Sequence, residues 1–440
     1  MRVQLFEAST SYQLMVLAAA IDAGCFEPVD ERLLLVSVNT PVPEVASRPD
    51  EAPGIDSLLG RFDRVLSLND LLAPVHPAAF RPRQGEQPLF ERLLRAAMGL
   101  PVDAAVELVV ESVQAPPSRS LLNVFGGSAA TVYAEGLMSY GPTRDPLPPQ
   151  AGSRVRRVLH LDLVPGLEPL LLTEYGVPAE AVPADAFRAV VAEVAAAARP
   201  TVPDEPYALV LGQYLAQLGL LSDRAEAALM ADLVRAAAAA GHRLIAVKPH
   251  PSAPPDALDA ALEAAPGARV VLLTDPVPAE ALCAVRPPEL VLGCFSTGLV
   301  TAARYWSVPA ASLGAERVLA ALPRFEDSNR VPLAIVERWL PGADGRPAHL
   351  TDHAALQRFV RTVGYAMQWR AHPEWREDAA AALAEDPAAY AAAVPRERLR
   401  RLALPGGWPV ALSGPAFART SPMAERALGA GTALRRRLTR

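Results

Sequence analysis

Lysine is almost absent from this chain. Of its 42 Lys and Arg residues, one is a lysine, Lys248, and it lies in the run LIAVKPHP over residues 244–251. Arginine does not replace lysine everywhere, because a guanidinium is a flat fork whereas an ammonium is a compact charge on a thin stem. An apolar run that ends in this lysine and in a histidine between two prolines indicates a crowded anion site. The alternative is that the lysine lies there by chance.

Cysteines and long apolar runs are also scarce. The three cysteines, Cys25, Cys283 and Cys294, have neither a disulfide pattern nor a metal-ligand spacing, which is typical of a reducing compartment. The apolar run over residues 14–21 is too short to span a bilayer, and the first residues lack the charged region of a signal peptide. We therefore expect a cytoplasmic protein.

Positive charge is not in excess. The formal net charge of -6 argues against a general nucleic-acid binder, so no nucleic acid is expected as a partner. The run LRRRLTR over residues 434–440 is a basic tail. Such a tail can contact anionic lipid, which predicts peripheral binding at the inner face of the membrane. A solvated terminus is the alternative.

Short apolar segments alternate with helical ones along the first two hundred residues. The pattern predicts a helix over residues 12–23 and strands over residues 2–7, 32–37, 64–68, 107–113, 120–125 and 157–164. Such alternation is typical of parallel α/β layers. We therefore predict a first Rossmann-like domain over residues 1–200.

A proline-rich segment over residues 196–206 interrupts this pattern and predicts a linker. Beyond it, the sequence predicts strands over residues 207–211, 243–247, 269–273 and 290–292 and a helix over residues 223–240. This pattern indicates a second Rossmann-like domain over residues 206–345, with a cleft between the two domains. The Ala- and Arg-rich remainder, residues 346–440, predicts a helical C-terminal extension.

His250 is the first candidate for chemistry. It follows the predicted strand over residues 243–247, and ligands of α/β domains bind at the carboxyl ends of strands. Pro249 and Pro251 would stiffen the loop, so that the imidazole could hydrogen-bond or protonate a phosphate leaving group. We expect Lys248 to orient this loop or to contact the charge of a bound anion.

The run LVLGCFSTGL over residues 290–299 predicts a strand, a turn of small residues and the start of a helix. Ser296 and Thr297 would lie at the helix N-terminus, where free backbone N–H groups and two hydroxyls favour an anion. An ordinary N-cap is the alternative. Because the run lies in the same predicted domain as His250, we expect Ser296, Thr297 and Gly298 to bind phosphate.

The run YAEGLMSYGPTR over residues 133–144 holds the third candidate. Glu135 lies in a turn-like stretch, and Gly136 after it would allow a close approach or a positive φ. A carboxylate at the mouth of a cleft is a suitable general base for a sugar hydroxyl. The alternative is a solvated acidic turn.

Taken in order, these three runs resemble the bacterial sialyltransferases, and most closely the α-2,8-polysialyltransferase family of capsule synthesis. That family carries an acidic-acidic-Gly motif in its first domain, and a His-Pro motif and a Ser or Ser-Ser/Thr motif in its second. Here the motifs are Ala134-Glu135-Gly136, His250-Pro251 and Ser296-Thr297. The resemblance covers roughly residues 1–320 and extends to residues 111–114 and 136–140. Ala134 departs from the pattern, because it replaces the first of the two motif acids.

The resemblance implies a GT-B fold, in which two Rossmann-like domains face each other across the active-site cleft. It implies an inverting, metal-independent transfer of sialic acid, or a related nonulosonic acid, from a CMP donor to a glycan hydroxyl. Glu135 would be the base, and no cofactor beyond the donor substrate is implied. The residues agree that no metal ion is needed, since no Asp-x-Asp pair lies near either predicted site.

Two other functions stay open. A Lys-Pro-His-Pro-like loop is shared by the CDP-glycerol phosphotransferases of teichoic acid synthesis, which also have GT-B folds and use a cytidine nucleotide. Glu135-Gly136 before Leu-Met-Ser-Tyr favours sialyl transfer over that function. Ala134 also leaves open a catalytically inactive protein of capsule assembly, although Glu135, His250 and Ser296 together argue against it.

Overall fold

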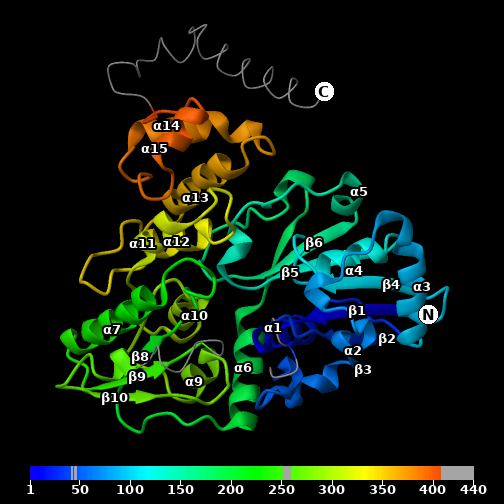
Figure 1. Ribbon diagram of the computed structural model, residues 1–440, viewed down its shortest axis with the longest axis horizontal. Coiled ribbons are helices and arrows are strands. Elements are labelled where there is room, and N and C mark those ends of the chain that lie inside the picture. The colour runs from blue at the N-terminus through cyan, green and yellow to red at the C-terminus, as the bar shows by residue number, and fades with distance from the viewer. Residues whose placement is uncertain (41–42, 44–46, 251–258, 408–440) are drawn as a thin grey trace, which may run out of the picture. The chain divides into compact units, whose positions relative to one another are not determined.

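The computed structural model describes residues 1–40, 43, 47–250 and 259–407 and divides into two units, Met1–Leu356 and Gln357–Arg440. The first unit contains two parallel β-sheets with helices packed around them, as Figure 1 shows. Two parallel sheets joined by helices form the two-domain α/β fold that the alternating segments predict. The described part of the second unit is helical, in agreement with the predicted C-terminal extension.

The first sheet, within the described residues, has seven parallel strands in the order β3-β2-β1-β4-β5-β6-β7. Its strands are β1 (Arg2–Ala8), β2 (Glu31–Val36), β3 (Arg64–Ser67), β4 (Ala105–Val110), β5 (Ala129–Ala134), β6 (Val155–Leu161) and β7 (Ala179–Val182). Strands β1, β2 and β4 are buried on both faces, which explains why they form nearly continuous apolar runs in the sequence. The strand order reverses between β1 and β4, as in doubly wound folds.

Helices connect these strands and cover the first sheet. They are α1 (Ser11–Asp22), α2 (Leu68–Leu72), α3 (Gln87–Ala97), α4 (Ser118–Val124), α5 (Pro149–Gly152) and α6 (Ala184–Ala198).

The strand predicted over residues 120–125 is wrong, because this segment belongs to α4. Pro116 and Pro117 precede the helix, a position that proline favours, and its apolar side chains are buried in the core of the first sheet. The neighbour of β4 is instead β5, which the sequence pattern did not reveal.

The second sheet, in the order β10-β9-β8-β11-β12, is also parallel. Its strands are β8 (Ala208–Leu211), β9 (Leu244–Lys248), β10 (Arg269–Leu272), β11 (Leu290–Gly293) and β12 (Ala310–Ser312). Its helices are α7 (Asp223–Ala239), α8 (Asp259–Leu262), α9 (Ala279–Val285), α10 (Thr297–Trp306), α11 (Ala315–Ala321) and α12 (Arg330–Trp339). The four predicted strands and the predicted helix of this half are confirmed within one or two residues.

Two helices join the sheets within the first unit. Helix α6 packs against α1 of the first half and α9 of the second, and in Figure 1 it stands between the two sheets. Helix α12 packs against the short 3-10 helix η6 (Gly136–Tyr140). The first three residues of the predicted linker belong to α6, and residues 199–206 form no helix or strand. The predicted domain limits at residues 200, 206 and 345 stay predictions.

The remaining helices are short or belong to the C-terminal part of the chain. The other 3-10 helices are η2 (Pro49–Glu51), η3 (Ile55–Arg61), η4 (Pro77–Ala79), η5 (Gln84–Glu86), η7 (Thr173–Tyr175) and η9 (Pro373–Trp375). The C-terminal helices are α13 (His353–Gln368), α14 (Arg376–Glu385) and α15 (Arg396–Arg401). In the second unit, Trp375 stacks on His372 with ring centroids 3.7 Å apart. The predicted basic tail over residues 434–440 lies outside the described residues.

Candidate active site

The candidate residues lie at the carboxyl ends of strands, near the points where the strand order reverses. In the first sheet, Glu7 lies near the end of β1, Glu111 follows β4 and Glu135 follows β5. In the second sheet, His250 follows β9 and Ser296 follows β11. Ligands of doubly wound folds bind at these reversal points, so both sheets present polar side chains where a ligand is expected.

Glu135 is held by the first turn of α1. Its carboxylate accepts a hydrogen bond from Nε2 of Gln13 at 3.1 Å and one from Oγ1 of Thr10 at 3.4 Å. Thr10 is also the N-cap of α1, and its Oγ1 accepts the backbone N–H of Gln13. The amino end of a helix favours a nearby negative charge. Glu135 is therefore a fixed, half-buried carboxylate rather than a solvated acidic turn.

The pKa of Glu135 is close to neutral. Burial is the main cause that raises it from 4.5 to about 7, because desolvation disfavours the charged form. The hydrogen bonds from Gln13 and Thr10 lower the pKa, whereas the charges of Glu280 and Glu7 raise it further. A carboxyl group with this pKa can take up a proton effectively at neutral pH.

Two more carboxyl groups lie near Glu135, and neither was predicted as a site residue from the sequence. Burial raises the pKa of Glu111 to about 8, with further contributions from the charges of Glu135 and Glu7. Glu7 is fully buried, and its carboxylate accepts hydrogen bonds from Ser118 Oγ at 2.6 Å and Ser37 Oγ at 2.8 Å. The signal that could have revealed both acids is their position at the end of an apolar strand.

Gly136 brings the two halves of the first unit into contact. Its φ is +70°, a conformation that favours glycine, and a Cβ atom built on it would lie 2.6 Å from Oγ1 of Thr297. Thr297 is the first residue of α10, in the second half. The structure thus has both features that the sequence predicts for Gly136, a positive φ and a close approach. Glu135 consequently lies one residue away from a contact with the predicted phosphate site.

Ser296 is the N-cap of α10, because its Oγ accepts the backbone N–H of Gly298 at 3.2 Å. The ordinary cap that the sequence left open is therefore present. Gly298 has a packing role, since a Cβ atom there would lie 2.8 Å from Cδ1 of Leu211 at the end of β8. Phosphate binding by Ser296, Thr297 and Gly298 stays a prediction.

Lys248 is buried at the end of β9. Its Nζ donates a hydrogen bond to the backbone oxygen of Asp275 at 2.9 Å, which ties β9 to the segment after β10. Burial lowers the pKa of Lys248, and the charges of Asp275 and Glu280 oppose this effect. Both predicted roles of Lys248, orientation of the His250 loop and binding of an anion, stay predictions.

His250 packs against the ring of Tyr214, with ring centroids 4.0 Å apart and planes tilted by 36°. Burial, and then the charge of Lys248, lower the pKa of His250 from 6.5 to about 4. The imidazole is therefore neutral at pH 7, which favours hydrogen bonding to a phosphate over protonation of it. Pro251, predicted to support His250, lies outside the described residues.

The loop over residues 212–216, after β8, was not predicted as part of the site from the sequence. The N–H of Gly212 donates to the backbone oxygen of Lys248 at 2.8 Å, and a Cβ atom on Gly212 would lie 3.1 Å from Cα of Pro249. The loop therefore packs directly on the Lys-Pro-His run. A glycine immediately after the first strand of the second half was the available signal.

Other reactive groups do not form a second centre in the described part of the chain. Burial is the first cause that raises the pKa values of Cys283 and Cys294 to about 12, which makes these thiols inert. Within residues 1–40, 43, 47–250 and 259–407, no group of three or more His, Cys, Asp or Glu side chains could hold a metal ion. In the same ranges, none of the helices combines the length and apolar character needed to cross a membrane.

The fold is similar to several solved structures at low sequence identity. The UDP-GlcNAc 2-epimerase from Methanocaldococcus jannaschii is 11% identical, with a TM-score of 0.42 over 83% of this chain and 100% of that chain. The S. aureus MnaA–UDP structure is 12% identical, with a TM-score of 0.40 over 83% of this chain and 97% of that chain. E. coli heptosyltransferase WaaC with ADP is 16% identical, with a TM-score of 0.29 over 71% and 86% of the two chains. Comparison with curated proteins gives no match.

A family comparison matches most of the first unit. The model of the alpha-2,8-polysialyltransferase (POLYST) family covers residues 4–315, which is more than half of the chain. Apart from Arg2 and Val3 at the start of β1, this range contains both sheets, and it contains the three motifs built around Glu135, His250 and Ser296. The chain therefore belongs to the alpha-2,8-polysialyltransferase family and is a glycosyltransferase of the sialyltransferase type.

Proposed function

We propose that this glycosyltransferase moves sialic acid, or a related nonulosonic acid, from its CMP donor to a glycan hydroxyl in capsule or surface polysaccharide synthesis. The acceptor oxygen attacks the anomeric carbon while the bond from that carbon to the phosphate oxygen of CMP breaks. The anomeric centre is inverted, the new linkage is α-2,8, and the hydroxyl proton passes to a base. Neither a metal ion nor a cofactor takes part in the proposed reaction.

The contact between Gly136 and Thr297 is the observation that carries this proposal. It places the residue after Glu135 against the first turn of α10, so a carboxylate and a helix N-terminus lie near each other. Transfer from a CMP donor needs a base for the hydroxyl and a binding site for the leaving phosphate. We assign the base to the first sheet and the phosphate-binding site to the second.

Glu135 is the proposed base. A pKa of about 7 leaves a substantial fraction of the carboxyl group ionised at neutral pH, and the same pKa makes it a stronger base than a solvated glutamate. Thr10 and Gln13 fix the carboxylate through their hydrogen bonds. The proton would arrive late, because an oxocarbenium-like transition state leaves the acceptor hydroxyl largely intact until the new bond forms.

The leaving phosphate is proposed to bind at His250 and at the amino end of α10. The neutral imidazole of His250 donates a hydrogen bond, and Ser296 and Thr297 contribute hydroxyl groups. The helix dipole adds partial positive charge at the same place. Lys248, two residues before His250 at the end of β9, is proposed to add positive charge near the phosphate. These groups would stabilise the negative charge that develops on the phosphate as its bond to the sugar breaks.

A donor screen tests the proposal. The pure protein is incubated with CMP-sialic acid and a panel of glycan acceptors, with and without EDTA, and the products are identified by mass. We expect sugar transfer that survives EDTA and that is lost in the Glu135→Gln variant. Transfer from CDP-glycerol instead would identify a phosphotransferase of wall polymer synthesis. Absence of reaction with both donors would favour an inactive protein of capsule assembly.

We also propose that the enzyme works in the cytoplasm and touches the inner face of the membrane through residues 434–440. The four arginines of this tail are attracted to anionic lipid. Sedimentation with vesicles that contain anionic lipid, compared with neutral vesicles, measures this contact. A chain shortened by the tail that sediments equally well would contradict the proposal.

A further inference from the structure

The loop over residues 212–216 is joined to two neighbouring segments of the second sheet. The N–H of Gly212 donates to the backbone oxygen of Lys248 at the end of β9. Oε1 of Gln213 accepts the N–H of Phe295 at 2.9 Å, and Phe295 directly precedes the N-cap of α10. The start of the loop is therefore tied to both segments that carry the proposed phosphate site.

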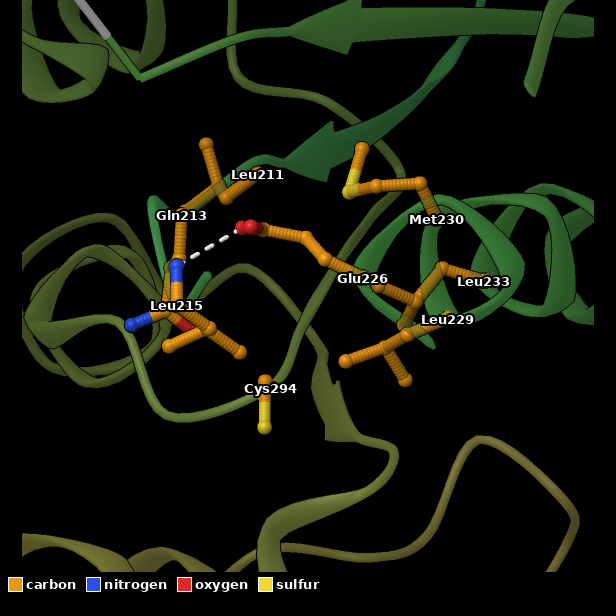
Figure 2. A pocket seen from close by; sticks show the side chains of 8 residues that line it. All are labelled: Leu211, Gln213, Leu215, Glu226, Leu229, Met230, Leu233 and Cys294. Atoms are coloured by element: carbon orange, nitrogen blue, oxygen red, sulfur yellow. Dashed lines mark hydrogen bonds between the residues drawn. The ribbon is translucent and has the colours of Figure 1, made fainter. Parts of the chain in front are cut away.

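Helix α7 holds the other end of the same loop. The carboxylate of Glu226 accepts the N–H groups of Leu215 and Ala216, each at 2.8 Å, and Figure 2 shows its side chain reaching from α7 to Leu215. Apolar side chains surround this contact and enclose a cavity of about 10 Å³, which is too small for a ligand. A charged group that makes two hydrogen bonds in such surroundings is a strong anchor for the backbone.

Tyr214 is the residue between these two attachments. Gln213 is fixed on one side of it and Leu215 on the other, so the position of the Tyr214 backbone is set by β11, β9 and α7. Its ring covers one face of His250, with centroids 4.0 Å apart. Burial, and then the charge of Glu135, raise the pKa of Tyr214, so Tyr214 lies within electrostatic range of the proposed base as well.

We propose that Tyr214 is a positioning residue for His250, and that Gln213 and Glu226 hold Tyr214 in place. The inference rests on the proposed function, in which His250 donates a hydrogen bond to the donor phosphate. The Tyr214 ring packs against the face of the imidazole, whereas hydrogen bonds form in the plane of the imidazole, so the two interactions do not compete. The Tyr214 ring, packed on one face of the imidazole, would restrict rotation of the imidazole and keep its N–H directed at the proposed phosphate site.

The state of His250 itself gives the first test. In protein labelled at histidine Cε1, the His250 signal is assigned by comparison with His250→Gln and followed by NMR as the pH changes. Tyr214→Leu removes the ring, so water reaches the imidazole and the pKa of His250 should rise from about 4 toward its usual 6.5. Tyr214→Phe keeps the ring and is the matched control, for which the titration should stay unchanged. Lys248, the charged neighbour that lowers the pKa of His250, is retained in both variants.

Transfer kinetics give the second test. We expect Tyr214→Leu to lower kcat about tenfold or more with little change in the KM for the acceptor, while Tyr214→Phe keeps most of the activity. Glu226→Gln is a milder variant for the case that Tyr214→Leu does not fold. The amide of the new glutamine offers one acceptor oxygen for the two N–H groups of Leu215 and Ala216. The pKa of His250 should therefore rise and kcat should fall, each by less than in Tyr214→Leu.

The two possible failures can be told apart. A His250 titration that is the same in wild type and Tyr214→Leu would overturn the positioning role, whatever the activity. A titration that moves as expected, in a protein that transfers nothing from CMP-sialic acid, would overturn the proposed function and leave the positioning role intact.

Discussion

Replacement of Gly136 by alanine should break the contact on which the proposed active site depends. Two unfavourable effects act together. An alanine held at a φ of +70° costs about 1–2 kcal/mol, because L-residues avoid this region. In addition, the new Cβ atom would lie 2.6 Å from Oγ1 of Thr297, which is closer than real Cβ contacts, so either the Thr297 side chain must rotate or η6 and α10 must move apart.

Gly24 is a matched control for the backbone effect alone. Its φ is +71°, and a Cβ atom there would have no neighbour within 4 Å. The difference between Gly136→Ala and Gly24→Ala therefore measures the clash, and overpacking of this kind costs about 1–3 kcal/mol. We expect the free energy of unfolding to fall by about 2–5 kcal/mol in Gly136→Ala and by about 1–2 kcal/mol in Gly24→Ala.

A second substitution should relieve the clash. Thr297→Ala removes Oγ1 and leaves Cβ of residue 297 at 3.5 Å, an ordinary contact distance. Urea unfolding at pH 7 of Gly136→Ala, Gly24→Ala, Thr297→Ala and the 136/297 double variant checks the stability, and initial transfer rates check the site. The double variant should lose less stability than the sum of its single variants. Equal losses in Gly136→Ala and Gly24→Ala, without relief by Thr297→Ala, would refute the contact.

Three further predictions concern charged residues. Glu135→Gln should bind CMP like the wild type but lose at least ~100-fold in transfer rate. The wild-type rate should rise with pH through about 7, because Glu135 loses its proton there. Full transfer by Glu135→Gln would remove Glu135 from the mechanism. Lys248→Arg should lower the melting temperature and the activity, because a wider guanidinium must fit where a buried ammonium donates a hydrogen bond to Asp275. Wild-type kinetics in this variant would indicate that the lysine lies there by chance. Glu111 has a pKa of about 8 in the folded protein against its usual 4.5, so between these values the folded state binds a proton that the unfolded chain does not. Stability should therefore fall as the pH rises from about 5 to 8, and Glu111→Gln should flatten this fall in urea midpoints measured across that range, whereas an unchanged slope would contradict the assignment.

Strands β8, β9, β10 and β11 of the second sheet could be predicted closely from the sequence, whereas β12 was not predicted. These four strands are short and apolar, and each appears as an isolated apolar run in the sequence. Lys248, for example, lies at the end of β9 as expected. The prediction of a strand over residues 120–125 was wrong because a short apolar run does not distinguish a buried strand from a buried helix. The preceding prolines indicated the helix, but β-like residues such as Val124 and Phe125 obscured it.

The candidate site was predictable only in part, because its supporting residues come from distant segments. Gly136 could be predicted, since a glycine after a motif acid is a local signal. Gln13 and Glu226 could not, because each acts through one tertiary contact, with Glu135 in the first case and with a loop backbone in the second. The sequence around these two residues predicts a helix but does not reveal such a partner. Tyr214 was missed for the same reason, since its contact with His250 joins the ends of two strands.

Ala134 departs from the acidic-acidic-Gly motif, and this departure left open the alternative of a catalytically inactive protein. The surroundings of Ala134 argue against that alternative. Its side chain is buried within the hydrophobic core of the first sheet, where an acid would be costly to ionise. A second carboxyl group is nevertheless present, since Glu111 follows the neighbouring strand β4, where Val110 pairs with Val132 of β5. Its charge and that of Glu135 interact, as the raised pKa of Glu111 indicates. The first sheet thus has two acids beside the proposed reaction centre, one in the motif and one directly after the adjacent strand β4. Under the proposed mechanism, the base is Glu135, so an alanine at position 134 leaves the proposed proton acceptor in place.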